Sequence, residues 1–187
     1  MNRLVLRNRQ RILNVDLRLL RRIVRTLVMK LTVVKEFELD VHLVDATEMT
    51  RINEAFLNHK GSTDVITFDY ADSAPGTVNG EMLICLNDAV TQAKRFRTSW
   101  QSELVRYLVH GLLHLRGFDD STSSARDRMK REENRLLRQL ERLFPLRRLS
   151  KTSRPAGQSI ADRKSQVGTS RRRLPARRPE RKPGVRQ

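Results

Sequence analysis

Two histidines four residues apart are the strongest sign of chemistry in this chain. His110 and His114 lie in a segment, residues 100–115, whose apolar residues recur at the spacing of a buried α-helix. Positions i and i+4 of a helix lie on one face, one turn apart, so both imidazoles can bind the same divalent ion. Zinc is the usual ion for nitrogen ligands. Because the chain has only four histidines, we predict that this pair belongs to a metal site.

The residues after His114 can bring a third ligand to the same ion. Gly117 suits the left-handed conformation with which many helices end, and the chain can then double back. Asp119 or Asp120 would then add a carboxylate oxygen. Three protein ligands leave one position for water, which a zinc ion can convert into a nucleophile near pH 7. The alternative is that the histidines are ordinary polar residues whose nitrogens find other partners.

The segment from His110 to Asp120 reads HGLLHLRGFDD and resembles the HGxLHLxGYDH signature of the YbeY family of endoribonucleases, also called rRNA maturation factors. Similar stretches precede it in the same order as in the family, namely Ile52-Asn53 with Phe56, Thr63–Phe68 and Gly80–Cys85. The resemblance therefore covers about residues 35–125. The family's third histidine falls on Asp120. The resemblance implies one Zn²⁺ held by His110, His114 and Asp120, with both histidines catalytic through the water on the metal.

The same resemblance implies a cellular role. It is that of a cytoplasmic, zinc-dependent endoribonuclease specific for single-stranded RNA. Such an enzyme acts on the RNA of the small ribosomal subunit, in 16S rRNA 3′-end maturation and late-stage ribosome quality control.

Two positions depart from the family pattern. Asp120 replaces a histidine, and a carboxylate is an acceptable zinc ligand. Because this ligand set is less positive by one charge, water on the metal should be less acidic than at a three-histidine site. An Asp120→His variant should therefore shift the pH–rate profile to lower pH, and an unchanged profile would contradict this. Leu57 stands where the family has a phosphate-facing arginine, and the nearest cations are His59, Lys60 and Arg51.

Two other functions compete with the nuclease. A zinc peptidase of the HExxH type has a glutamate directly after its first histidine as general base, whereas this chain has Gly111, which leaves the helix surface bare. A casein assay with zinc tests this alternative. The second is a non-catalytic ribosome-assembly factor that binds rRNA and keeps the metal for structure, which the missing arginine favours. Comparing RNA cleavage by wild type and His114→Ala distinguishes it from an enzyme.

Hydrophobic periodicity predicts the elements that position these residues. Strands are expected at 4–6, 37–43, 63–68 and 81–86, and helices at 17–31, 46–57, 87–97, 100–115 and 123–144. Their order predicts an α+β fold, in which a small mixed sheet of about four strands packs with about five helices in a zincin-like layer. Expected helix N-caps are Asp45, then Asn87 or Asp88, then Thr98 or Ser99.

Positive charge is concentrated at the C-terminal end. Residues 147–187 carry 14 Lys and Arg against two acidic residues, so +12 of the chain's net +17 lies there. They contain too few apolar residues to offset the entropy of ordering them, and we expect a domain at 1–146 followed by a disordered basic tail at 147–187. Lys60 and the arginine clusters of the tail are candidate nucleic-acid contacts. The arginines of these clusters are Arg171, Arg172, Arg173, Arg177 and Arg178. The alternative is a tail that only solubilises the protein or touches anionic lipids.

Cysteine usage and hydropathy bear on the compartment. The single cysteine, Cys85, lies in an apolar run and is expected to be a core residue, which fits a reducing compartment. No apolar stretch is long enough to span a bilayer, and early charges argue against a signal peptide. We therefore expect a cytoplasmic protein.

Overall fold

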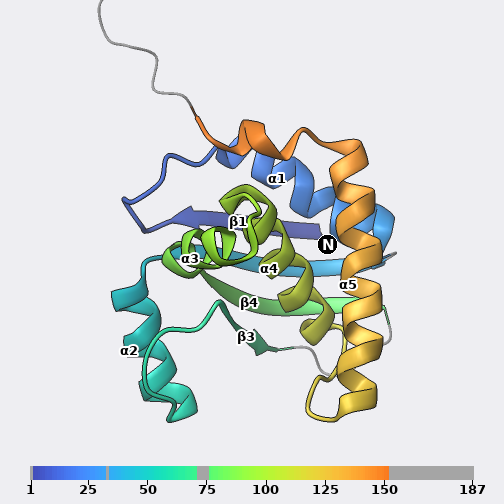
Figure 1. Ribbon diagram of the computed structural model, residues 1–187. Coiled ribbons are helices and arrows are strands. Elements are labelled where there is room, and N and C mark those ends of the chain that lie inside the picture. The colour runs from blue at the N-terminus through green and yellow to red at the C-terminus, as the bar shows by residue number, and fades with distance from the viewer. Residues whose placement is uncertain (1, 33, 71–75, 152–187) are drawn as a thin grey trace, which may run out of the picture. The chain divides into compact units, whose positions relative to one another are not determined.

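The fold is built on a mixed four-stranded sheet. The computed structural model describes residues 2–32, 34–70 and 76–151. Within them the strands are β1 (Asn2–Asn8), β2 (Glu36–Val44), β3 (Val65–Asp69) and β4 (Thr77–Cys85). Their order across the sheet is β1-β2-β4-β3; the first three are parallel, and β3 is antiparallel to β4 (Figure 1). The expected mixed sheet is confirmed, and β1 lies at one edge of it.

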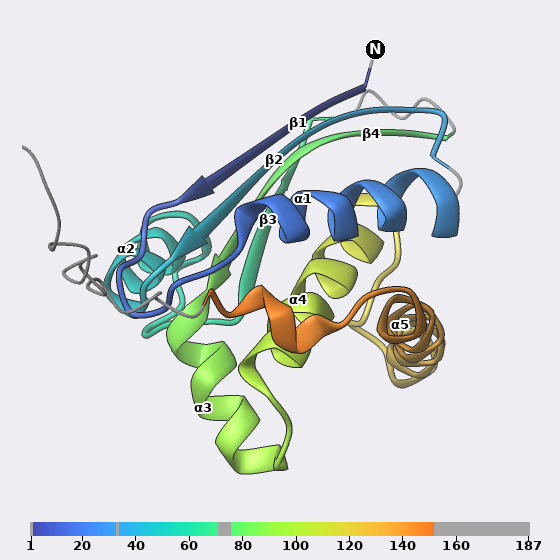
Figure 2. The ribbon, with the colours of Figure 1, turned by 90° about the horizontal axis from the view of Figure 1, so that it is seen from above.

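The expected helices are also present and lie mainly on one face of the sheet. In the described residues they are α1 (Leu17–Thr26), α2 (Ala46–Leu57), α3 (Leu86–Phe96), α4 (Trp100–Leu115) and α5 (Ser123–Leu143). Helices α1 and α4 pack against the sheet, and α3 and α5 each pack against α4 (Figure 2). Helix α2 lies towards one end of the sheet, where it contacts β4 and α3 (Figure 2). The α+β class predicted from the sequence is therefore confirmed.

Alternation along β4 divides its apolar side chains between two cores, because successive residues of a strand point to opposite faces. Met82 and Ile84 join the larger core, which contains α1, α4 and α5. Leu83 and Cys85 join a smaller core with α2. Burial raises the pKa of the Cys85 thiol to about 12, so the thiol stays protonated and unreactive. The core role expected for this cysteine is confirmed.

Helix α4 is the buried element that carries both histidines. Ser99 caps its N-terminus by accepting a hydrogen bond from the Ser102 backbone N–H. Gly111 faces the sheet, where a Cβ would lie 3.1 Å from Val65 Cγ2 and 3.2 Å from Thr67 Cγ2. The bare helix surface noted in the sequence is thus filled by β3. This close approach fixes the distance of α4, and hence of its histidines, from the sheet.

Several element ends differ from the sequence prediction, and two of these differences have a clear structural reason. Strand β4 begins at Thr77, because its pairing with β2 starts there and runs along the whole strand. Helix α3 has no side-chain N-cap. Asn87, an expected cap of α3, instead accepts a hydrogen bond of 2.8 Å from the backbone N–H of Ala46, at the start of α2. The cap prediction failed because the side chain found a partner that is distant in sequence.

The folded part of the chain extends beyond residue 146, the boundary expected from the sequence. A short 3₁₀-helix, η2 (Leu146–Leu149), buries Leu146 and Leu149 against the main core. The backbone N–H of Lys151 then donates to the carbonyl of Asn14. The packing of these two leucines places the boundary later, at or after Lys151.

Most of the expected basic tail lies outside the described residues, including Arg171, Arg172, Arg173, Arg177 and Arg178. Its disorder and its contacts with nucleic acid therefore stay predictions. Within the described part of the chain, none of the helices has the length and apolar character needed to cross a membrane.

Candidate metal centre

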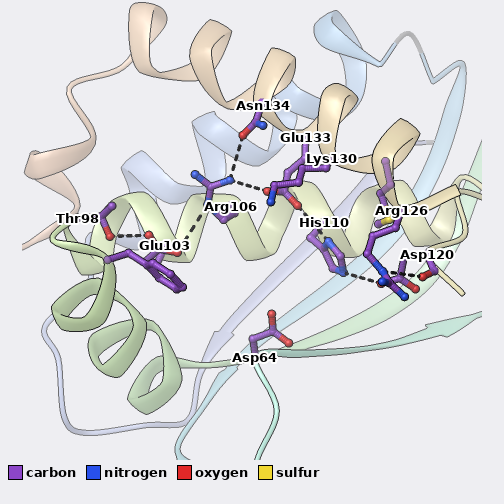
Figure 3. A pocket seen from close by; sticks show the side chains of 12 residues that line it. Asp64, Thr98, Glu103, Arg106, His110, Asp120, Arg126, Lys130, Glu133 and Asn134 are labelled. Carbon is purple, nitrogen blue, oxygen red and sulfur yellow. Dashed lines mark hydrogen bonds and ion pairs between the residues drawn. The ribbon is translucent and has the colours of Figure 1, made fainter. Parts of the chain in front are cut away.

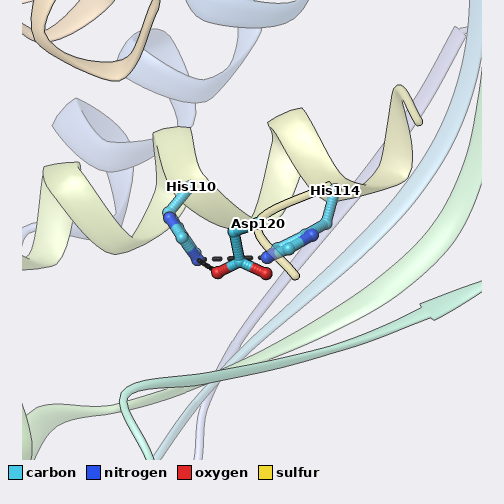
Figure 4. Close-up of side chains that lie close together, drawn as sticks. All are labelled: His110, His114 and Asp120. Carbon is cyan, nitrogen blue, oxygen red and sulfur yellow. Dashed lines mark hydrogen bonds and ion pairs between the residues drawn. The ribbon is translucent and has the colours of Figure 1, made fainter. Parts of the chain in front are cut away.

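Helix α4 and the loop after it bring three potential ligands together. The Nε2 atoms of His110 and His114 are 3.1 Å apart on one face of the helix (Figure 4). Gly117 has φ +80°, and this left-handed residue turns the chain so that Asp120 lies beside both rings. One ligand atom from each of the three residues lies within 4.8 Å of the others. Asp119, the other candidate, instead accepts a hydrogen bond from the Ser121 backbone N–H.

The partners of the two Nδ1 atoms determine where the imidazole protons lie. His114 Nδ1 is 3.2 Å from the carbonyl oxygen of Phe118, and His110 Nδ1 is 3.1 Å from Glu133 Oε2. A carbonyl and an ionised carboxylate only accept hydrogen bonds, so both Nδ1 atoms carry hydrogen. In neutral imidazoles the two Nε2 lone pairs then face each other and repel unless a proton or a cation lies between them.

These distances fit a metal ion. Two nitrogens on a tetrahedral zinc ion, each bound at about 2.0–2.1 Å, lie about 3.3 Å apart, close to the separation in this site. Asp120 Oδ2 is 4.0 Å from His110 Nε2 and must move slightly closer to complete such a set. Asp120 lies in an open turn, which permits that movement. The donor set of two imidazoles and one carboxylate is one that zinc accepts.

A partly buried ion-pair network contacts the Nδ1 side of His110. Arg106 Nη1 donates to Glu133 Oε1 at 2.6 Å, and Arg106 also contacts Glu103 and Asn134. Burial raises the pKa of Glu133, but the hydrogen bonds from His110 and Arg106 outweigh it, so the pKa is lowered. Burial likewise lowers the pKa of His110, yet the hydrogen bond and charge of Glu133 raise it overall. Glu133 is therefore an anion that orients His110.

A pocket of about 580 Å³ opens beside the ligands (Figure 3). Helix α5 forms one wall of it with Arg126 and Lys130, and Asp64 faces His110 from the strand side. Its remaining lining comes from the ends of α3 and α4 and from the buried side of α5: Phe96, Thr98, Glu103, Arg106, Met129, Glu133 and Asn134. The pocket can therefore hold a ligand that touches the metal site and the basic wall together.

The structure gathers some of the residues singled out in the sequence and leaves others apart. His110, His114 and Asp120 come together as predicted, while the binding of an ion to them stays a prediction. Lys60 and Leu57 are exposed and do not line the pocket. Sequence reasoning missed Glu133, Arg106, Arg126 and Lys130, because a helical pattern alone does not show which polar residues of α5 and α4 face each other.

Comparisons with known proteins show which family the sequence resembles. The family model described as endoribonuclease YbeY matches residues 6–141. An endoribonuclease YbeY of Chlorobium phaeovibrioides is 36% identical over 104 residues, which is 56% of this chain and 69% of that protein. One of Chlorobium luteolum is 42% identical over 92 residues, covering 49% and 66%.

A solved structure shares the fold. The solution structure of TM1509 from Thermotoga maritima matches with a TM-score of 0.55 at 22% identity, and the match covers 82% of this chain and 99% of that one. The family match includes every element from β2 to α4, both histidines, Asp120 and Glu133. The chain therefore belongs to the endoribonuclease YbeY family.

Proposed function

We propose that this protein is a zinc-dependent endoribonuclease that cleaves single-stranded RNA. The observation that carries the proposal is the convergence of the Nε2 atoms of His110 and His114, 3.1 Å apart, beside a carboxylate in an open pocket. When bound there, the ion would act as a Lewis acid on a phosphate oxygen and would lower the pKa of a coordinated water molecule. The relatives' endoribonuclease name supports the same reaction class.

The protein's own residues would fix the geometry. The Phe118 carbonyl sets the tautomer of His114, and Glu133 does the same for His110. Arg106 holds Glu133 in place and partly neutralises it. The site is thus positioned by contacts that exist before any substrate binds, which lowers the cost of reaching the reactive arrangement.

Ribosomal RNA of the small subunit is the substrate that we propose, with a role in 16S rRNA 3′-end maturation and ribosome quality control in the cytoplasm. The resemblance of the His110–Asp120 segment supports this role. The excess of basic residues at 147–187 supports attraction to RNA of any sequence.

The decisive experiment is an RNA cleavage assay with metal-loaded protein. Wild-type protein should cut a single-stranded RNA, and chelation of the metal or the His114→Ala substitution should abolish cleavage. A circular-dichroism spectrum of the variant serves as the control for folding. Equal cleavage by wild type and His114→Ala would show a contaminating nuclease, and no cleavage by loaded wild-type protein would favour the non-catalytic assembly factor.

The structure weakens the peptidase alternative. A general base directly after the first histidine would have to occupy position 111, and a side chain there would run into Val65 and Thr67. A glutamate in that position would therefore point into the sheet rather than towards a substrate.

A further inference from the structure

Two cations on α5 stand beside the metal ligands without an acidic partner. Arg126 and Lys130 are one helical turn apart, exposed, and part of the pocket wall (Figure 3). Among the described residues, neither forms an ion pair with a carboxylate within 4.0 Å. By contrast, the third cation of the pocket, Arg106, is engaged by Glu133, Glu103 and Asn134. Of these three cations, Arg126 and Lys130 are therefore the two whose charge no acidic partner in the described residues neutralises.

A hydrogen bond to the backbone of Asp120 holds Arg126 beside the candidate metal site. Its Nε donates to the carbonyl oxygen of Asp120 at 3.3 Å. This contact uses one N–H group and leaves the two terminal nitrogens of the guanidinium free, which is the fork that suits phosphate oxygens. The guanidinium is thereby held next to the third ligand. Lys130, four residues further along, adds a point charge on the same face.

We propose that Arg126 and Lys130 bind the phosphate backbone of RNA in the pocket beside the metal ligands. The proposal rests on the proposed function and names the residues that position the substrate. Because both side chains are exposed and have no acidic partner among the described residues, binding a phosphate breaks no existing ion pair. Leu57, exposed and outside the pocket, supplies no charge there.

The same pocket also contains a residue that suits a nucleobase. Phe96, the last residue of α3, has 61% of its surface exposed and lines the pocket. An exposed aromatic ring is a stacking surface for an unpaired base, and single-stranded RNA is recognised largely by such stacking. The pocket therefore combines a phosphate contact and a ring contact, which favours a nucleotide of single-stranded RNA over a free phosphate.

The test is the salt dependence of binding. The full chain, loaded with zinc, is titrated with a short fluorescent single-stranded RNA at several salt concentrations, before cleavage products form. Each cation lost from a single-strand complex should reduce the slope of log Kd against log salt by about 0.7, so Arg126→Gln/Lys130→Gln should lower it by about 1.4. The charge-conserving Arg126→Lys/Lys130→Arg variant should keep the wild-type slope.

The matched control removes the same charge elsewhere on α5. Arg131 and Arg138 are exposed and do not line the pocket, so Arg131→Gln/Arg138→Gln should leave the slope unchanged. Phe96→Ala should weaken binding about tenfold without changing the slope, because stacking involves no counterion release. The proposal would be overturned if Arg131→Gln/Arg138→Gln lowered the salt slope as much as Arg126→Gln/Lys130→Gln. It would also be overturned if Arg126→Gln/Lys130→Gln left the salt slope unchanged.

Cleavage is measured separately, so the two proposals can fail separately. If wild-type protein cuts RNA but the Arg126→Gln/Lys130→Gln variant binds RNA with the wild-type salt slope, the phosphate site is refuted while the nuclease stands. If no protein cuts RNA but the slope difference persists, the phosphate site stands and the enzyme is refuted.

Discussion

The rings of His110 and His114 are held from behind by different acceptors, an anion and a neutral carbonyl. Glu133 adds negative charge and basicity to His110, whereas the Phe118 carbonyl mainly fixes the orientation of His114. Asp120 has no such support from the core and sits in an exposed turn. The three candidate ligands are therefore unequal, and their contributions can be separated by substitution.

Asp120→Ala should lose most bound metal, because two imidazoles alone leave the ion with too few protein ligands. Asp120→His should retain it, since imidazole replaces carboxylate in the same set. Elemental analysis of the purified proteins measures both. Full metal content in Asp120→Ala would show that Asp120 is not a ligand. Asp119→Ala is the matched control and should keep its metal, because Asp119 lies outside the candidate ligand group.

Glu133→Gln should weaken zinc binding about 10- to 100-fold, the usual effect of losing a hydrogen-bonded partner behind a histidine ligand. Competition with a zinc-binding dye gives the affinity. Glu132→Gln is the control, because the neighbouring Glu132 pairs with Arg135 on the exposed side of α5. Similar affinities for both variants would mean that Glu133 does not orient the ligand.

Among the elements, α4 matters most, since it carries two of the candidate ligands and packs against β3 and β4. Its position depends on close contacts with glycines. Gly111 lets the middle of α4 approach β3, and Gly80 of β4 lets its end, Leu115, approach the sheet. The site's position relative to the sheet is therefore set by backbone packing rather than by the ligands themselves.

Gly80→Ala should destabilise the fold by about 1–3 kcal/mol, the range for overpacking. A Cβ there would lie 2.7 Å from the Phe68 carbonyl oxygen and 2.8 Å from Leu115 Cδ2, and the backbone atom cannot move aside cheaply. Urea denaturation measures the change. Asn79→Ala, at the exposed neighbouring position, should cost much less; equal costs would contradict the packing argument.

At the scale of the whole molecule, the folded domain includes η2, which packs against α1 and α4. Val15 pairs with Ser150 in an isolated bridge, and Leu149 is fully buried. The N-terminal and C-terminal parts of the domain are thus joined, so the domain is incomplete if cut at 146.

Leu149→Ala should destabilise the protein by about 2–5 kcal/mol, as expected for a large-to-small change in a core. Leu143, which is 56% exposed, is the matched control, and its substitution by alanine should change the free energy of unfolding by less than about 0.5 kcal/mol. Thermal or chemical denaturation compares them. Wild-type stability in Leu149→Ala would place the domain boundary back at 146.

The sequence alone determined the element order, the α+β class and the histidine pair, because each rests on local regularity. It left the third candidate ligand open between Asp119 and Asp120, and the resemblance to the family favoured Asp120. Apolar spacing marks helices and strands, i and i+4 place two histidines on one face, and Gly117 permits the return of Asp120. The fold brought Glu133 behind His110, Arg126 beside Asp120 and Asn87 to the start of α2. Such contacts join residues far apart along the chain or on different elements, and their formation depends on how helices pack, which no local pattern encodes.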